Sequence, residues 1–249
     1  MLIVGCYFGL IPWNMERLQI DESDLGFAIL SFGVSFLISN QIAGRLLVPK
    51  FGTKIIMTCG LVFISFSNII LVSAPTYLIL LLAHIPAGIG WGSSGPIGGI
   101  HTQLIEKHSE KIISPYYAMG FNIGIFIGGI LAGFILSNTM NPTFVFIILF
   151  LLSILVSFTI YMNGLPKDLD FEGEGEKLKI PEKNVLIFGF LLFVIFGSNG
   201  IIIDWSALWF TKELSAPLYL ASLGLIFLSF GGMFANLFSN QLIKLFSEK

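Results

Sequence analysis

Charged side chains are scarce in this sequence of 249 residues: Asp, Glu, Lys and Arg make up 11% of it, while hydrophobic residues make up 55%. Soluble domains typically carry about 25% charged residues. A soluble fold of this length could not cover so much apolar surface, because its outside must face water. The composition therefore excludes a soluble enzyme and a disordered chain. The net charge of −2 gives no basis for binding nucleic acid.

Cysteine is nearly absent as well. Cys6 and Cys59 each lie within an apolar run, which is typical of small buried side chains and not of a disulfide framework or a metal site. No basic stretch precedes the apolar residues 1–13, and no small-residue cleavage site follows them, so no cleavable signal peptide is predicted. We expect neither a metal nor a cofactor.

Long hydrophobic runs are what the sequence has in excess. A helix needs about 20 apolar residues to cross the hydrocarbon core of a membrane. Residues 1–13 could form only about 20 Å of helix against a core of about 30 Å, so they predict one short span. Seven full spans are predicted at residues 25–44, 55–74, 77–99, 115–136, 142–162, 184–203 and 217–243. The sequence therefore predicts an all-α, polytopic membrane protein.

The basic residues fall mostly on one side of these spans. If the N-terminus is cytoplasmic, the inner loops and the C-terminal end hold eleven Lys and Arg residues, and the outer loops hold only Arg17 and Lys212. Cytoplasmic loops of membrane proteins carry such an excess. We therefore expect a multi-pass protein of the cell membrane with both termini in the cytoplasm.

A polar stretch and an internal repeat divide the chain. Residues 163–183 carry four Lys and six Asp or Glu and predict a solvated cytoplasmic loop. Residues 25–36 and 223–234 are identical at seven of twelve positions, and such repeats are typical of transporter folds. We expect a six-helix half at 1–162, the central loop at 163–183, and two helices that begin a second half at 184–249.

Three segments resemble the major facilitator superfamily (MFS). The loop RLLVPKFGTK is similar to the family's gating motif after its second helix, with matches at Lys50, Gly52 and Lys54. The fourth span and the fifth span carry glycines spaced as in the family, which we expect to pack helices closely. These are Gly88, Gly90, Gly92, Gly120, Gly124, Gly128 and Gly129. The resemblance implies twelve helices in two halves, so we expect that about eight are present and that the chain is incomplete.

A fourth segment suggests a subgroup. The stretch SNGIIIDWSALWF resembles the sugar-type, fucose-permease-like branch, with matches from Asp204 to Leu208. Interfacial aromatics beside a solvated loop carboxylate would explain the same residues.

The family resemblance implies a secondary transporter that works by alternating access, with the lipid bilayer and a small solute as partners. His84 stands where the family has Arg, and it is the only residue in the seven full spans that readily takes a charge near neutral pH. It is therefore the candidate for proton coupling, unless it is a neutral histidine bonded to a neighbouring helix. The expected substrate pathway comprises Tyr7, Trp13, His84, Trp91, Asn122, Asn199 and, at its mouth, Asp204. Such neutral and aromatic groups suit a sugar-like or other neutral or amphipathic solute.

Two alternatives stay open. An integral membrane enzyme would need clustered catalytic groups, and His101, Glu106, His108 and Glu110 sit close together in the predicted loop after the fourth span. The chain could also be a non-transporting remnant or a membrane partner protein. The oligomeric state is left open.

Overall fold

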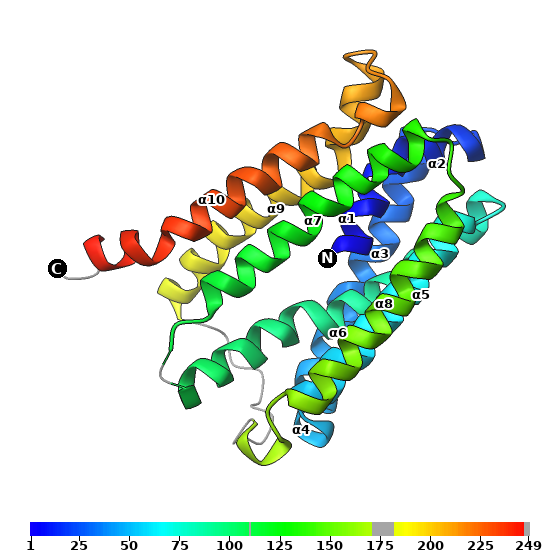
Figure 1. Cartoon of the computed structure of the whole chain (residues 1–249). Helices are drawn as coiled ribbons and strands as arrows, with labels where there is room; N and C mark the ends of the chain where they lie inside the picture. Colours follow the sequence, from blue (N-terminus) through cyan, green and yellow to red (C-terminus); the bar gives the residue numbers. More distant parts are fainter. Residues whose placement is uncertain (110, 171–181, 247–249) are drawn as a thin grey trace.

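The computed structural model describes residues 1–109, 111–170 and 182–246, and this part of the chain contains helices and loops without a strand (Figure 1). Seven of its helices are long and apolar enough to cross a membrane, which confirms the predicted helical membrane protein. The helices are α1 (Leu2–Gly9), α2 (Ile11–Leu18), α3 (Glu22–Ile42), α4 (Val48–Phe51), α5 (Thr53–Ser73), α6 (Tyr77–Ser109), α7 (Ser114–Ser137), α8 (Pro142–Asn163), α9 (Lys183–Lys212) and α10 (Leu223–Phe246). Residues 171–181 of the predicted central loop, and Glu110, lie outside the described residues.

The first apolar segment is a helix broken in two. α1 ends at Gly9, and α2 begins at Ile11 with Pro12 in its first turn, where a missing backbone N–H does no harm. α2 continues to Leu18 and ends at Gln19, whose φ of 54° is left-handed. The predicted boundary at residue 13 was therefore too early.

Three other predicted boundaries were also wrong, in the same direction. α6 continues ten residues past Gly99, α9 continues to Lys212, and α3 runs through a π-helical stretch (Ala43–Leu47) into α4. Helices keep their backbone hydrogen bonds beyond the hydrocarbon core, so hydropathy marks only the part of each helix that lipid surrounds. Asp204 accordingly lies within α9, and the alternative interpretation of Asp204 as a loop carboxylate was wrong.

α5 and α6 form the centre of the first six spans. α6 packs against both α3 and α5, α8 packs against the other side of α5, and α7 packs against α1 and α10 (Figure 1). The largest fully buried side chains among the described residues come from six different helices or their ends, among them Leu10, Leu80, Ile135 and Phe146. α9 differs from the others, since residues 182–199 are exposed in the described structure.

Candidate functional site

A cavity of about 1000 Å³ lies between the two predicted halves, and eight helices contribute to its wall: α1, α2, α3, α5, α6, α7, α9 and α10. Six of the seven residues predicted for the substrate pathway line it: Tyr7, His84, Trp91, Asn122, Asn199 and Asp204. Trp13 is the exception, since it packs beside the buried core and lies under the Arg17 guanidinium, 4.9 Å from the ring centre. Trp13 thus lies outside the wall of this cavity, and its place on the substrate pathway stays a prediction.

Tyr7 and His84 form a buried pair. The His84 Nδ1 atom lies 2.8 Å from the Leu80 carbonyl oxygen, which can only accept, so this nitrogen carries the hydrogen. Nε2 is then free to accept from the Tyr7 hydroxyl at 3.1 Å. Both ring nitrogens of a neutral imidazole are satisfied in this way, and the side chain is only 4% exposed. The imidazole is thus fixed in one orientation at the cavity wall.

Aromatic rings make up much of the remaining wall. The Trp91 ring on α6 lies 5.9 Å from the Phe121 ring on α7, and Phe32, Phe196 and Phe227 come from three further helices. The sequence analysis did not select Tyr117 and Phe121, which lie five residues and one residue before the selected Asn122 on α7. Their own spacing of four residues, which puts two aromatic rings on one face of the helix, was the signal that could have found them. The wall is therefore suited to a flat, apolar solute.

Polar atoms in the wall are few and mostly satisfied within their own helices. The Asn122 amide donates to the Ala118 carbonyl at 3.0 Å, and the Asn199 amide donates to the Ile195 carbonyl at 2.9 Å. Asp204 differs, because none of the hydrogen bonds or ion pairs among the described residues involves its carboxylate. Among the described residues, Asp204 is the acidic side chain of the cavity wall, and none of them pairs with its carboxylate.

Asn68 is a wall residue that sequence analysis missed. Its side chain is 3% exposed, and its amide donates to the Ile64 carbonyl at 2.9 Å. Its Oδ1 atom has no hydrogen-bond partner in the described structure. A buried oxygen without a donor is costly, so it offers an acceptor to a bound molecule. A single Asn in an apolar span is the only signal that the sequence holds.

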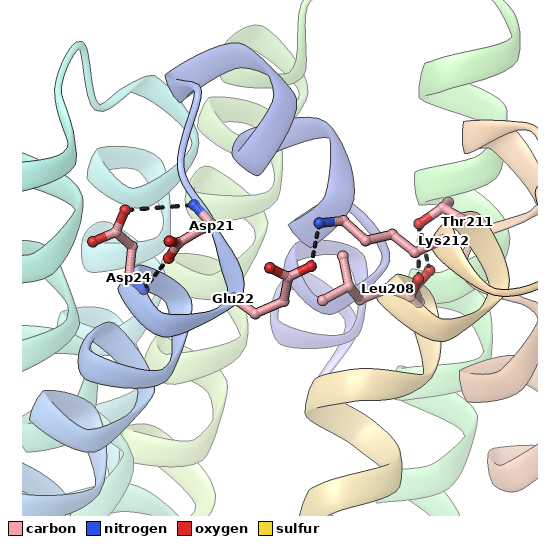
Figure 2. Close-up of polar contacts among 7 residues, drawn as sticks. Asp21, Glu22, Asp24, Leu208, Thr211 and Lys212 are labelled. Atoms are coloured by element: carbon pink, nitrogen blue, oxygen red, sulfur yellow. Dashed lines mark hydrogen bonds and ion pairs between the residues drawn. The ribbon is translucent and has the colours of Figure 1, made fainter.

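The C-terminal end of α9 meets the start of α3 at one end of the bundle. Leu208 is 5% exposed and packs, with Trp205, into the core cluster of the first six spans. Beyond it, Lys212 on α9 forms an ion pair with Glu22 at the start of α3 (Figure 2). Asp21 and Asp24 cap the same end of α3 by accepting from each other's backbone N–H groups. We call this end, marked by Leu208 and Glu22–Lys212, the α3–α9 end.

Most of the predicted packing glycines lie where helices meet. A Cβ atom on Gly88 would lie 2.1 Å from Ser35 Oγ on α3, and one on Gly90 would lie 2.5 Å from the Ile64 backbone nitrogen on α5. Gly92 meets the Phe36 carbonyl on α3 in the same manner, at 2.5 Å.

The glycines of α7 face two helices. Gly124 and Gly128 meet the start of α1, and Gly129 meets Ile226 on α10. At Gly120, by contrast, a Cβ would meet none of the described atoms within 4 Å, so the close packing expected there is not found.

The predicted gating motif lies beyond the other end of α3, away from the α3–α9 end. Lys50 is on α4, Gly52 forms the turn with a φ of 84°, and Lys54 is in the first turn of α5. The motif is therefore mostly helical, and only Gly52 breaks the helix, whereas a loop of ten residues was predicted.

The histidines considered for an enzyme do not converge. α6 extends through His101, Glu106 and His108, so the predicted loop is a helix there. His101 is buried and contacts the Thr53 hydroxyl, whereas His108 is exposed and bonds to its own helix. Glu106 accepts from the backbone of Ile113 and Ser114 at the start of α7. Each group thus has a local structural contact.

Comparison with known proteins agrees with this architecture. The chain is 24% identical over 207 residues to an uncharacterized MFS-type transporter of Yersinia pestis, covering 81% of this chain and 52% of that protein. It is 24% identical over 159 residues to the quinolone resistance protein NorA of Staphylococcus aureus, covering 61% of this chain and 41% of NorA. The chain therefore spans about half the length of the curated relatives it matches. The sequence profile of the Major Facilitator Superfamily matches residues 1–249 in full, and the chain belongs to that family.

Proposed function

We propose that this chain is part of a secondary transporter that moves a small, largely apolar solute across the cell membrane by alternating access. The observation that carries the proposal is the cavity of about 1000 Å³ between the first six spans and α9 and α10. Rocking of two halves about such a cavity would expose it to each side in turn. Family membership supports transport over enzymatic activity.

The solute that fits the cavity is aromatic or amphipathic and carries a positive charge or a hydrogen-bond donor. Rings such as Trp91 and Phe121 would cover its apolar surface, and the unpartnered carboxylate of Asp204 would face its polar group. A sugar, as in the fucose-permease-like branch, would need many more hydrogen-bonding groups than this wall offers. The name of the relative NorA, a quinolone resistance protein, also favours an amphipathic solute.

Uptake into proteoliposomes tests this proposal. We expect a fluorescent aromatic cation such as ethidium to accumulate, and a neutral monosaccharide not to. Asp204→Asn should weaken ethidium binding by about tenfold or more, since it removes a charge-assisted contact. The control is Glu213→Gln, an exposed carboxylate just beyond the end of α9. Absence of uptake with either probe in the protein from its native membrane would favour the non-transporting alternative.

We further propose that protons drive transport and that His84 carries them. The neutral imidazole accepts at Nε2 from Tyr7, so its protonation requires the Tyr7 hydroxyl to turn away. Such a rearrangement at the cavity wall would couple the proton to the solute site. If His84 instead stays neutral and only joins α6 to α1, another residue must couple proton movement to transport.

Variants at His84 distinguish these two roles. We expect His84→Ala and His84→Gln to abolish accumulation driven by a pH gradient while the protein stays folded. Exchange of solute at equal pH on both sides should persist, because it needs no proton. Unchanged gradient-driven accumulation in either variant would refute the coupling role and would leave the transport proposal intact.

The proposed domains and orientation follow from the same architecture. Residues 1–162 would form one half, 163–183 the cytoplasmic central loop and 184–249 the start of the second half, with both termini in the cytoplasm. Basic residues at the end that holds the α4–α5 turn support this orientation. The internal repeat also supports four further spans in the working transporter. The intact mass of the native protein tests that expectation, since this chain weighs 27.4 kDa.

A further inference from the structure

The start of the central loop is fastened to the inner end of the first six spans. We call residues 164–170 the linker segment and residues 50–54 the α5 turn. The Lys167 ammonium donates to the Lys50 carbonyl at 2.8 Å, and the Lys54 ammonium donates to the Gly164 carbonyl at 3.4 Å. These two contacts run in opposite directions between the segments, so they hold the linker segment along the turn.

Asp170 makes the closest contacts of this junction. One carboxylate oxygen accepts from the Thr53 backbone N–H at 2.7 Å, and the other accepts from the Thr53 hydroxyl at 2.6 Å. The first N–H groups of a helix have no partner within it and favour a negative charge. Gly52 precedes α5 and offers no side chain to cap it. Asp170, 117 residues away in sequence, therefore caps α5.

His101 orients the capping contact. The single hydrogen of the Thr53 hydroxyl points to Asp170, so the hydroxyl oxygen must accept from His101 Nδ1, which lies at 2.8 Å. The imidazole of His101 thus donates to the Thr53 hydroxyl, and the hydroxyl donates to the Asp170 carboxylate. In a catalytic triad the imidazole lies between the other two groups. Here the hydroxyl lies between them, so the arrangement holds a carboxylate and does not activate a nucleophile.

Gly52 makes room for the carboxylate. A Cβ atom at this position would lie 2.7 Å from Asp170 Oδ2, too close for any side chain. The φ of 84° also favours glycine. Thr53, His101 and Asp170 are 0%, 5% and 7% exposed, so the site excludes water around the charge.

We infer that the α5 turn and His101 form a carboxylate-binding site, and that its occupant is the linker segment, held through Asp170. Docking changes the connection between the two halves. With the site filled, residues 171–182 alone connect Asp170 to the start of α9, a reach of at most about 43 Å at about 3.3 Å per residue. With the site empty, the connection begins at the end of α8 and reaches about 66 Å. The docked linker thus limits how far the inner ends of the halves can separate.

Hydrogen exchange at the Thr53 amide tests this inference in the purified full chain, without any solute. Asp170 is the acceptor for this N–H, so Asp170→Ala should speed its exchange by about tenfold or more, as expected for loss of a hydrogen bond to a charged group. The matched control is Asp168→Ala, an exposed carboxylate two residues away that joins none of the described contacts. It should leave the exchange unchanged.

A second variant keeps the carboxylate in place and removes its hydroxyl donor. Thr53→Val should also speed exchange at residue 53, whereas Thr53→Ser should not. Hydrogen exchange within α7 and α10 reports whether a variant has unfolded. If Asp170→Ala has unfolded, the comparison of Thr53→Val with Thr53→Ser tests the inference instead. Exchange within twofold of the unmodified protein in Asp170→Ala and Thr53→Val, or equal acceleration in Asp168→Ala, would overturn the inference. None of these readouts depends on transport.

Discussion

Gly90 lies where α6 packs closely against α5, and adding one methyl group there should separate the two helices. A Cβ atom at this position would lie 2.5 Å from the backbone nitrogen of Ile64 and 2.8 Å from its Cα, whereas ordinary contact begins at 3.4 Å. The helices would have to move apart by about 0.9 Å, because backbone atoms cannot rotate away as a side chain could. Overpacking of this kind costs about 1–3 kcal/mol.

Gly99 supplies the control on the same helix, since a Cβ there would meet none of the described atoms within 4 Å. We expect Gly90→Ala to lower the thermal unfolding midpoint in detergent by several degrees. Gly99→Ala should leave it unchanged or raise it, because alanine favours a helix by about 1 kcal/mol over glycine. Equal stability of Gly90→Ala and the unmodified protein, or an equal loss in both variants, would refute the argument from close packing.

Three further predictions concern the two ends of the bundle and the cavity wall. Lys212→Glu should lower the unfolding midpoint slightly and Glu22→Lys should restore it in the double variant. The pair is half exposed and contributes at most about 1 kcal/mol, and strictly additive effects would show that it contributes nothing. With the native cysteines removed, Asn138→Cys should react with an impermeant maleimide only from outside and Asn163→Cys only from inside; labelling from one side would refute the topology. Tyr7→Phe should lower stability by about 1 kcal/mol in an unfolding titration, since the histidine that it contacts loses a donor, and an unchanged midpoint would argue against that bond.

The seven full spans could be predicted because the hydropathy of a segment depends only on its local amino-acid composition. The ends of the helices could not be predicted, for a physical reason visible at Asp204. Lipid disfavours a carboxylate, so the predicted span stopped just before it, yet α9 continues for eight more residues. A charged residue inside a helix is tolerated where it faces a cavity, and no local pattern reports what a residue faces.

The cavity residues were predicted in part. His84 and Trp91 could be found since they stand out in an apolar helix, and both line the cavity. Trp13 stands out equally but packs against Arg17 and the core. Asp170 gave no signal at all, because its contact with Thr53 joins positions 117 residues apart. Polar residues in apolar runs can thus be counted from sequence, whereas their partners depend on how the helices are arranged.

His84 and Asp204, two ionisable groups of the cavity wall, differ in how their hydrogen bonds are satisfied. This difference bears on which helices a bound solute would pull together. His84 belongs to the first six spans and has both its contacts there, with Leu80 and Tyr7. Asp204 belongs to α9, and its carboxylate has no partner among the described residues. A charge in a partly buried site is stabilised strongly by any group that pairs with it. A cationic solute stacked on Trp91 and paired with Asp204 would therefore draw α9 toward α6. The free energy of binding would then favour movement of the second half relative to the first, which is the movement that the proposed alternating access requires.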